Sequence, residues 1–292
     1  MFKLLTEPTF LLALITLLGL LVGSFLNVVI YRLPIMMDRA DKAYGWEVLH
    51  GGEGGPNPYE GERFDLMYPP SRCPNCGKQI RPWQNIPVLS YLLQGCKCAY
   101  CRTPISPRYM AVELLTALLS FLVAKNFSDP WQLVLALLLT WSLIALFFID
   151  LEHQLLPDSI TLPLLWLGLA MAALPPLWER NLFFTGTEEA LQGAIFGYLI
   201  LWLTFWIFKL VTGKEGMGYG DFKLLAVLGA WEGAGALPFI LFVSSLLAVA
   251  YGFSKKVGFG RAFAYGPFLI IAGWLNFMYA PLISNYLALI GL

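Results

Sequence analysis

Charged residues are scarce in this chain, and neither sign of charge predominates. Only 13% of its 292 residues are charged, whereas about one quarter of an ordinary soluble domain is. Basic and acidic residues number 19 each, and there are only two histidines. This composition excludes a disordered chain, a collagen and a coiled coil, and the lack of a basic excess excludes a typical nucleic-acid-binding protein. We therefore expect no nucleic acid among its partners.

Apolar residues occur instead, in long uninterrupted stretches. Hydrophobic residues make up 58% of the chain, and six stretches contain no charged side chain. These stretches are 8–31, 130–149, 159–178, 190–208, 233–254 and 262–292. Each has roughly the 20 residues that a helix needs to cross the hydrocarbon core of a bilayer. A soluble protein would have to bury all of them as apolar helices, so the sequence predicts an all-α protein that crosses a lipid bilayer many times.

The stretches, taken with the turns between them, predict about eight transmembrane segments. We place these segments at 10–30, 109–124, 131–149, 160–178, 190–208, 222–231, 236–253 and within 267–292. The sixth is short, because ten helical residues rise only about 15 Å. Residues 33–107 hold most of the charge and all five cysteines. The predicted domains are a first segment in 1–32, a small inserted domain at 33–107 and a membrane core at 108–292.

Lysine and arginine predict the orientation of the segments, because cytoplasmic loops carry an excess of them. With residues 33–107 in the cytoplasm, 16 basic residues fall on that side and three on the other. This arrangement needs two passes between Asp221 and Lys255. It also puts Asp150, at the end of the third segment, and Asp221, at the start of the sixth, at the same membrane depth on the cytoplasmic side.

Asp150 and Asp221 are the candidate catalytic residues, because an ionisable group inside a membrane segment is costly and is a functional candidate by default. Two close carboxyl groups share a proton near neutral pH. The ionised one can take a proton from a water molecule that attacks a peptide carbonyl, while the protonated one hydrogen-bonds the carbonyl oxygen. This is aspartic protease chemistry, and it needs neither a metal nor a nucleophilic side chain.

Other roles for these acids stay open from sequence. Each could be an interfacial acid paired with a lysine, or a proton relay of a transporter. Asp158 is a rival for Asp150, although a helix N-cap is the simpler role at its position. We expect Glu152 to be solvated and Glu113, inside the second segment, to make an interhelical hydrogen bond.

Glycine alternates with other residues immediately before Asp221. Gly218 and Gly220 remove side-chain bulk and permit positive φ angles, so that the backbone can come close to another chain. We therefore predict that this Gly-x-Gly turn lets an extended peptide approach the two carboxyl groups.

Four of the five cysteines form two C-x-x-C pairs. Cys73 and Cys76 are separated by 21 residues from Cys98 and Cys101, close to the spacing of about 15–20 residues in structural zinc sites. Two such pairs complete a closed tetrahedral site, and a reducing cytoplasm favours metal over disulfides. We predict a structural Zn²⁺ bound by these four thiolates, with two disulfides or free thiols as the alternative. Cys96 could replace Cys98, but the spacing favours Cys98.

Several motifs together closely resemble the bacterial prepilin peptidases, also called type IV leader peptidases, over nearly the whole chain. They lie at 23–34, at the two cysteine pairs with 81–87 between them, at 150–158, at 216–223 and at Tyr265-Gly266-Pro267. The Gly-x-Gly-Asp motif alone would be a weak signal, but the combination is specific. The chain departs from the usual pattern at Met110, where a proline is common, and at Cys96, where a glycine is common.

The resemblance implies a bifunctional aspartic protease and methyltransferase of the bacterial inner membrane. Such enzymes cleave the basic leader of type IV prepilins, or of type II secretion pseudopilins, at the cytoplasmic membrane face. They then methylate the new N-terminal amine, usually of phenylalanine, with S-adenosylmethionine. The family's catalytic pair maps onto Asp150 and Asp221. Its cysteine domain is associated with methylation and is absent from peptidase-only relatives, so the resemblance implies both activities.

The sequence leaves the methyltransferase site and the oligomeric state unassigned. No Rossmann-type glycine fingerprint indicates where S-adenosylmethionine binds. Glu60, Glu62 and Asp65 are candidates only by type, because a carboxylate near the amine suits methyl transfer. The alternatives are a peptidase-only enzyme that uses the cysteine domain for docking, and a proton-coupled transporter that uses the two aspartates as relay groups.

Overall fold

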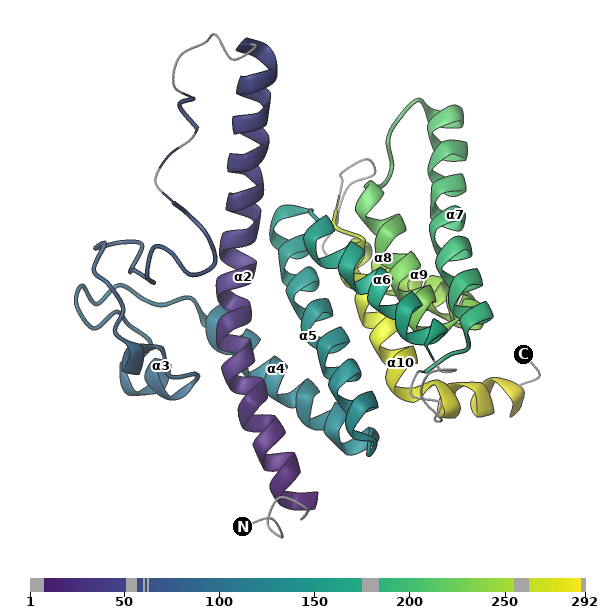
Figure 1. Ribbon diagram of the computed structural model, residues 1–292, viewed down its shortest axis with the longest axis horizontal. Helices are drawn as coiled ribbons and strands as arrows, with labels where there is room; N and C mark the ends of the chain where they lie inside the picture. The colour runs from purple at the N-terminus through teal and green to yellow at the C-terminus, as the bar shows by residue number, and fades with distance from the viewer. Residues whose placement is uncertain are drawn as a thin grey trace. The chain divides into compact units, whose positions relative to one another are not determined.

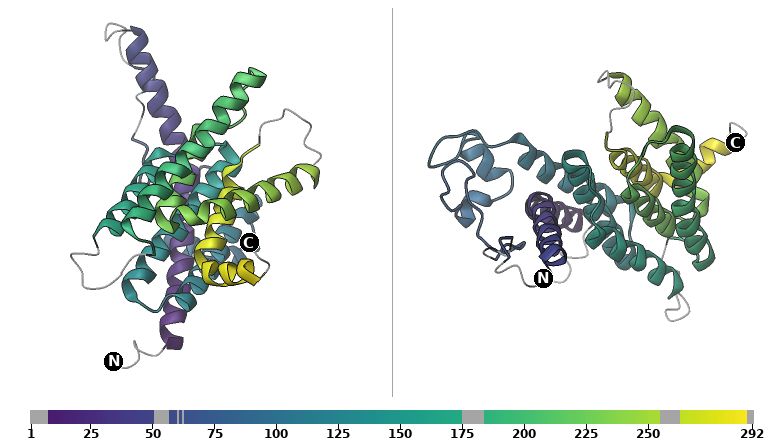
Figure 2. Two further views of the ribbon diagram at one scale, coloured as in Figure 1. Left: turned by 90° about the vertical axis from the view of Figure 1, so that its right-hand side faces the viewer. Right: turned by 90° about the horizontal axis from the view of Figure 1, so that it is seen from above.

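Helices make up most of the structure of this protein. The computed structural model describes residues 8–50, 57–59, 61, 63–174, 184–254 and 263–289. Within these residues, two isolated β-bridges are the only sheet-like pairs, and all other regular elements are helices (Figures 1 and 2). The chain divides into two compact units, Met1–Lys125 and Asn126–Leu292. The predicted division at 1–32, 33–107 and 108–292 stays a prediction.

The first unit is built on one long helix, α2, which runs over Pro8–His50. Its 43 residues correspond to about 65 Å of helix, twice the thickness of about 30 Å of a bilayer's hydrocarbon core. The predicted first segment lies inside it, but the helix does not end near Pro34, where the apolar stretch stops. A proline inside a helix removes one backbone hydrogen bond, and its ring crowds the carbonyl of the residue four positions earlier. The residues that follow Pro34 make their own hydrogen bonds, and the helix continues.

A second helix, α4, Pro107–Asn126, packs against the apolar part of α2. Gly19 and Gly23 of α2 lie in the contact. A Cβ on Gly23 would be 2.7 Å from Glu113 Cα, and one on Gly19 would be 2.7 Å from Ser120 Oγ. Small residues allow membrane helices to approach this closely. The predicted second segment is therefore confirmed as a helix that packs directly on the first.

The residues between α2 and α4 form turns and two short helices. These are the 3₁₀ helix η1, Pro82–Asn85, and the helix α3, Leu89–Leu93. One β-bridge pairs Arg72 with Gln79, and the other pairs Lys97 with Pro104. Each bridge closes a small loop that contains one of the C-x-x-C pairs, so both pairs lie on knuckle turns, as their spacing suggests.

The second unit holds the remaining helices. They are α5, Pro130–His153; α6, Asp158–Ala173; α7, Thr187–Thr212; α8, Tyr219–Glu232; η3, Ala234–Ala236; α9, Leu237–Ser254; and α10, Gly266–Leu289, which kinks at Tyr279. Each predicted segment of this part of the chain corresponds to one helix. The predicted fourth segment runs past the end of α6, and its residues 175–178 lie outside the described residues.

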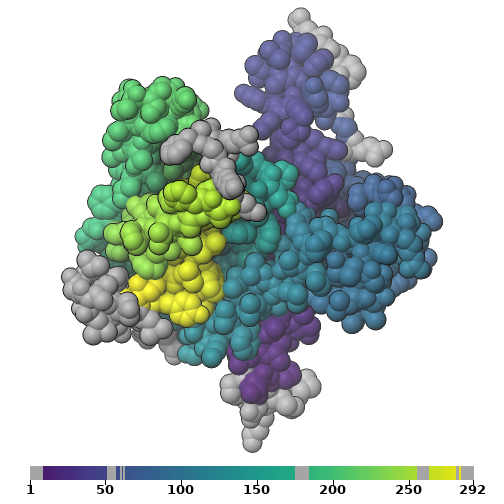
Figure 3. Space-filling model, turned by 180° about the vertical axis from the view of Figure 1, so that it is seen from behind, coloured from purple at the N-terminus to yellow at the C-terminus, as the bar shows by residue number. Residues whose placement is uncertain are grey.

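The short helix α8 forms the core of the second unit. It packs against α6, α7 and α10 (Figure 1). Its residues Leu224, Leu225, Leu228 and Trp231 are fully buried. Trp231 Nε1 donates a hydrogen bond of 2.9 Å to the carbonyl of Leu164 in α6. Helix α9 lies beside α10 (Figure 3). Because α8 is covered by protein, the longer helices around it supply the surface that faces lipid.

Length and hydropathy identify the helices that can cross a membrane. Among the described residues, five qualify: α2, α4, α5, α7 and the continuous stretch of η3 and α9. Helix α6 and residues Gly266–Ala280 of α10 are shorter apolar helices, and α8 is the short sixth segment. These eight elements coincide with the eight predicted segments, so the prediction of an all-α, multi-pass membrane protein is confirmed.

Helices α7 and α8 cross at glycines. A Cβ on Gly229 of α8 would collide with the backbone of Gly193 of α7, and a Cβ on Gly197 would lie 2.6 Å from the carbonyl oxygen of Leu225. The helix backbones therefore touch, and neither can move aside without disturbing the packing of α8.

We expect Gly229→Ala to lower the free energy of unfolding by about 1–3 kcal/mol, the usual cost of overpacking a core. Thermal unfolding of the detergent-solubilised protein measures this effect. Gly252→Ala in α9 is the matched control, because no other part of the described structure lies within 4 Å of the Cβ that it adds. An unchanged midpoint for Gly229→Ala would contradict the close crossing.

Candidate functional site

Asp150 lies in the last turn of α5. The helix ends at His153, and the left-handed C-cap residue Gln154 (φ 52°) donates its backbone N–H to the Asp150 carbonyl at 2.9 Å. The Asp150 side chain is 4% exposed, and its Oδ2 has no hydrogen-bond partner among the described residues. A buried polar atom without a protein partner is costly, so this oxygen is suited to accept a hydrogen bond from water or a substrate.

Asp221 comes from a separate part of the chain, the first turn of α8. Gly218 is the N-cap of this helix, and the Asp221 carboxylate hydrogen-bonds to the backbone of Gly218, as the third residue of a capping box does. The Asp221 side chain is 7% exposed. The Asp150 carboxylate is near enough to interact electrostatically with that of Asp221. The structure therefore brings together the two acids that the sequence singles out.

Two glycines and a leucine pack around these acids. A Cβ on Gly266, the first residue of α10, would lie 2.5 Å from Asp150 Oδ2, and a Cβ on Gly220 would lie 2.8 Å from Leu156 Cβ. Glycine alone permits such close approach without displacing the neighbouring group. The Tyr265-Gly266-Pro267 motif thus has a spatial role, because its glycine makes room for Asp150.

The glycines before Asp221 do not adopt the positive φ angles that glycine permits. Gly218 is extended, with φ −82° and ψ 150°, and Gly220 lies within α8, so neither uses a positive φ. Gly220 makes room for Leu156, whereas the nearest atom to a Cβ on Gly218 is the backbone nitrogen of Gly220 at 4.0 Å. Gly218 therefore leaves open space, and the approach of a peptide there stays a prediction.

Asp158, the rival of Asp150, forms an ion pair. Both of its carboxylate oxygens accept hydrogen bonds from Lys223 Nζ at 2.7 Å. It lies in the first turn of α6, where Pro157 and not Asp158 is the N-cap, so the expected capping role is wrong. Glu152 is exposed, as expected.

Glu113 joins three parts of the first unit. Its carboxylate accepts a hydrogen bond of 2.7 Å from the backbone N–H of Val88, which precedes α3, and another from the Ser24 hydroxyl of α2. The interhelical hydrogen bond predicted for this acid is therefore confirmed. The bond to Val88 additionally fastens the cysteine-containing segment to α4.

Cys73, Cys76, Cys98 and Cys101 gather at one point. Their sulfur atoms all lie within 4.8 Å of one another, and the Sγ atoms of Cys73 and Cys101 are 3.8 Å apart. Tetrahedral coordination with Zn–S bonds of about 2.3 Å separates sulfur atoms by about 3.8 Å. All five cysteines, each of them described, are free thiols. The four residues therefore fit a tetrahedral metal ion, and the alternative of two disulfides is not what the structure contains.

The surroundings of Cys101 favour a thiolate, the form that binds metal. Hydrogen bonds from the hydroxyl and backbone N–H of Thr103, followed by the amide of Asn75, lower the pKa of the Cys101 thiol to about 5. Cys96 is not one of the clustered residues. Its φ of 62° and its backbone hydrogen bond to Tyr91 place it in the turn before the second knuckle, in keeping with the preference for Cys98 as the ligand.

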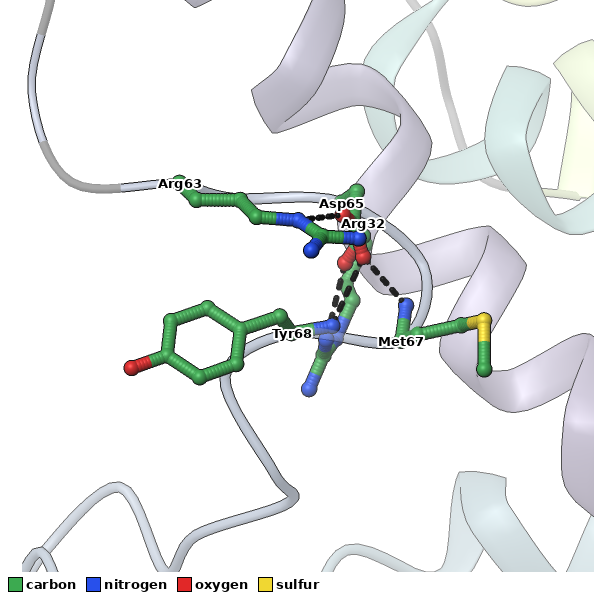
Figure 4. Close-up of polar contacts among 5 residues, drawn as sticks. All are labelled: Arg32, Arg63, Asp65, Met67 and Tyr68. Carbon is green, nitrogen blue, oxygen red and sulfur yellow. Dashed lines mark hydrogen bonds and ion pairs between the residues drawn. The ribbon is translucent and has the colours of Figure 1, made fainter.

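Asp65 organises a turn between α2 and the first knuckle. Its carboxylate accepts hydrogen bonds of 2.7 Å from the backbone N–H groups of Met67 and Tyr68 and pairs with Arg63 (Figure 4). The hydrogen bond from Arg63, followed by those from the backbone, lowers the pKa of Asp65. Three acids are candidates for the methylation site. The Asp65 carboxylate is engaged within this turn. Glu60 and Glu62 lie outside the described residues.

Arg32 is a buried cation that sequence reasoning missed. Its side chain is 7% exposed and donates hydrogen bonds of 2.8 and 2.6 Å to the carbonyls of Asp65 and Pro69. The guanidinium also lies 5.6 Å from the centre of the Phe64 ring. Arg32 therefore ties the turn to α2 (Figure 4). The only sequence feature that could have indicated this role is that Arg32 is the first charged residue after the first apolar stretch.

Known protein families match most of the chain. Residues 17–127 match the Bacterial Peptidase A24 N-terminal domain, and residues 137–253 match the Type IV leader peptidase family. The first match contains the cysteine cluster, and the second contains Asp150 and Asp221. No solved structure matches the chain.

Curated relatives are similar over nearly their whole length. A protein of Dichelobacter nodosus, named prepilin leader peptidase/N-methyltransferase, is 53% identical over 269 residues, which cover 92% of each chain. Relatives of the same name are 51% identical in Pseudomonas aeruginosa and 49% identical in Neisseria gonorrhoeae, with 92% and 89% of this chain and 90% and 87% of theirs covered. These identities and the two family matches show that the chain belongs to the type IV leader peptidase family.

Proposed function

We propose that this protein is a membrane-embedded aspartic endopeptidase and N-methyltransferase. It cleaves the leader peptide of type IV prepilins, or of type II secretion pseudopilins, and then methylates the new N-terminal residue. The observation that carries the peptidase half is the buried pair formed by Asp150 of α5 and Asp221 of α8. Relatives that are 53% and 51% identical to this chain are both named prepilin leader peptidase/N-methyltransferase, which supports both the peptidase and the methyltransferase activity.

In this proposal the two acids carry one proton between them. The ionised carboxyl group takes a proton from a water molecule while the water oxygen attacks the carbonyl carbon of the scissile peptide bond. The protonated group hydrogen-bonds the carbonyl oxygen as negative charge develops there. When the carbon–nitrogen bond breaks, the amine leaves with a proton from the pair, which again holds one. The open space at Gly218 is where we infer that the extended peptide approaches.

We place the reaction at the cytoplasmic face of the bacterial inner membrane. The support is the distribution of lysine and arginine, which puts the starts of α6 and α8 on the side with most of the basic residues. A prepilin has an apolar helix for the bilayer and a basic leader for the cytoplasm. Its cleavage site then lies at the depth of Asp150 and Asp221.

We assign Zn²⁺ to the four clustered cysteines as a structural ion. The support is their mutual sulfur distances. Such a closed four-thiolate site stabilises a small domain and leaves no position for substrate. For methylation, S-adenosylmethionine is the proposed donor, and it supplies a methyl group that the neutral N-terminal amine accepts. The lipid bilayer and the prepilin are the partners that this function requires.

Mass spectrometry of a prepilin incubated with the full-length enzyme in detergent tests the proposal. With S-adenosylmethionine present, we expect loss of the leader and a gain of about 14 Da at the new N-terminus, the mass of one CH₂. Without the donor, we expect loss of the leader alone.

Each other outcome of that experiment overturns a defined part of the proposal. Leader loss without the added mass would leave a peptidase whose cysteine domain serves docking. An unchanged prepilin, with correctly folded enzyme, would contradict the peptidase and return the two acids to a proton relay. The Asp150→Asn variant serves as the control for contaminating proteases.

A further inference from the structure

Leu156 packs against glycines that adjoin the two acids. It belongs to residues 154–157, which connect α5 to α6, and its side chain is 7% exposed. It fills the space left by Gly220, whose Cβ would be 2.8 Å from Leu156 Cβ and 3.2 Å from Cδ1. It also reaches Gly266, whose Cβ would be 3.3 Å from Leu156 Cδ1. One leucine thus contacts two glycines from different helices.

Both glycines are coupled to the acids. Gly220 directly precedes Asp221 in the chain, and the backbone of Gly266 hydrogen-bonds to the carboxyl group of Asp150. Close-packed interiors transmit a change in side-chain volume to the neighbouring backbone. The volume of Leu156 therefore determines how near the start of α10 and the start of α8 can come, and with them the surroundings of each carboxyl group.

An ion pair holds the segment that carries Leu156. Asp158 follows Leu156 by two residues, Lys223 follows Asp221 by two residues, and Lys223 Nζ donates to both oxygens of Asp158 at 2.7 Å. The start of α6 is thereby tied to the start of α8. This pair is partly exposed, so it contributes little to overall stability, but its two-oxygen geometry restrains the connection between α5 and α6.

We propose that Leu156 is a positioning residue for the two aspartates and that the Lys223–Asp158 ion pair holds it in place. The proposal rests on the proposed function, because it assumes that Asp150 and Asp221 share a catalytic water. Proton transfer requires donor and acceptor within about 2.6–3.2 Å. A displacement of about 1 Å costs about 10²-fold in rate. Because Leu156 is buried and apolar, we expect it to act on the rate of the chemical step and not on substrate binding.

The first test replaces Leu156 by smaller and by similar side chains. We expect Leu156→Ala to lower kcat for leader cleavage by about 10²-fold, with KM within about threefold of the wild type. Leu156→Met, which nearly keeps the volume, should recover most of that loss. Leu162→Ala, a partly exposed leucine of α6, is the matched control and should cleave normally. If Leu156→Ala fails to fold, Leu156→Val replaces it, with a loss of several-fold.

The pH profile separates positioning from partial unfolding. A preparation with fewer folded molecules has a lower kcat and an unchanged pH dependence. Acids that have moved apart interact less, so the two limbs of the bell-shaped pH–rate profile lie closer together. We expect this narrower profile for Leu156→Ala and the wild-type profile for Leu162→Ala.

The second test reverses the ion pair. Asp158→Lys and Lys223→Asp should each lower kcat several-fold, and the double variant should return to within about threefold of the wild type, because the attraction is restored. A double variant no better than either single variant would overturn the role of the pair. A wild-type kcat and pH profile for Leu156→Ala would overturn the positioning role. If Asp150→Asn still cleaves in the same assay, the proposed function fails instead.

Discussion

Asp150→Asn and Asp221→Asn are each expected to reduce leader cleavage by about 10²–10⁴-fold, the contribution of a general acid or base, and in practice to below detection. Asparagine has the shape of aspartate but can neither take the proton of the attacking water nor give one to the leaving amine. At position 221 it also keeps a side-chain oxygen for the Gly218 backbone, so the start of α8 is preserved. Mass spectrometry of the prepilin measures the loss.

The control for this prediction is Glu152→Gln. Glu152 lies two residues from Asp150 at the same helix end, yet it is exposed, so its loss of charge should leave cleavage near the wild-type rate. Thermal unfolding in detergent shows that the asparagine variants are folded. Retained cleavage in either asparagine variant would refute the assignment of these two residues as the catalytic pair.

The double variant Cys73→Ser, Cys76→Ser is expected to lose its bound metal, from about one zinc per chain to almost none. Serine is a poor zinc ligand, and removing one knuckle leaves two thiolates, which do not complete a four-coordinate site. Binding energy of a structural metal is folding energy for a small domain, so we expect methylation to fall below detection. Cleavage should be reduced far less, because the two aspartates lie in the other compact unit.

Cys96→Ser is the matched control for the metal. It removes a cysteine close in sequence to the second knuckle but outside the sulfur cluster, so we expect full zinc content and normal methylation. Elemental analysis of the purified protein and the mass shift of the product give the two readouts. Zinc and methylation both retained in the double variant would show that the four thiols are not the ligands.

The charge pattern predicted the membrane segments and both acids because the bilayer imposes a simple rule. A charged residue at the end of an apolar stretch is conspicuous, so Asp150 and Asp221 stand out in the sequence. Cysteine spacing is equally local, and the cluster of four thiols follows from it. These features depend on length, charge and spacing, which are properties of the chain itself.

The features that the sequence did not predict depend on contacts between distant residues. Leu156 is one apolar residue among many, and only the two glycines that it meets in space give it a particular role. The ion pair of Asp158 joins residues from different helices, so an N-cap was the simpler interpretation. The continuation of α2 past Pro34 and the burial of Arg32 both depend on how the following turn folds back.

The short length of α8 has a consequence for how the protein is made. Its 14 residues rise only about 21 Å, less than a bilayer's hydrocarbon core, and its first turn carries Asp221. Such a segment is too short to cross the bilayer by itself, so we expect it to be inserted together with α7, against which its Gly229 packs. Asp150 meets its neighbour Gly266 only when α10 has been made. We therefore expect a nascent chain to lack cleavage activity until α10 has been made.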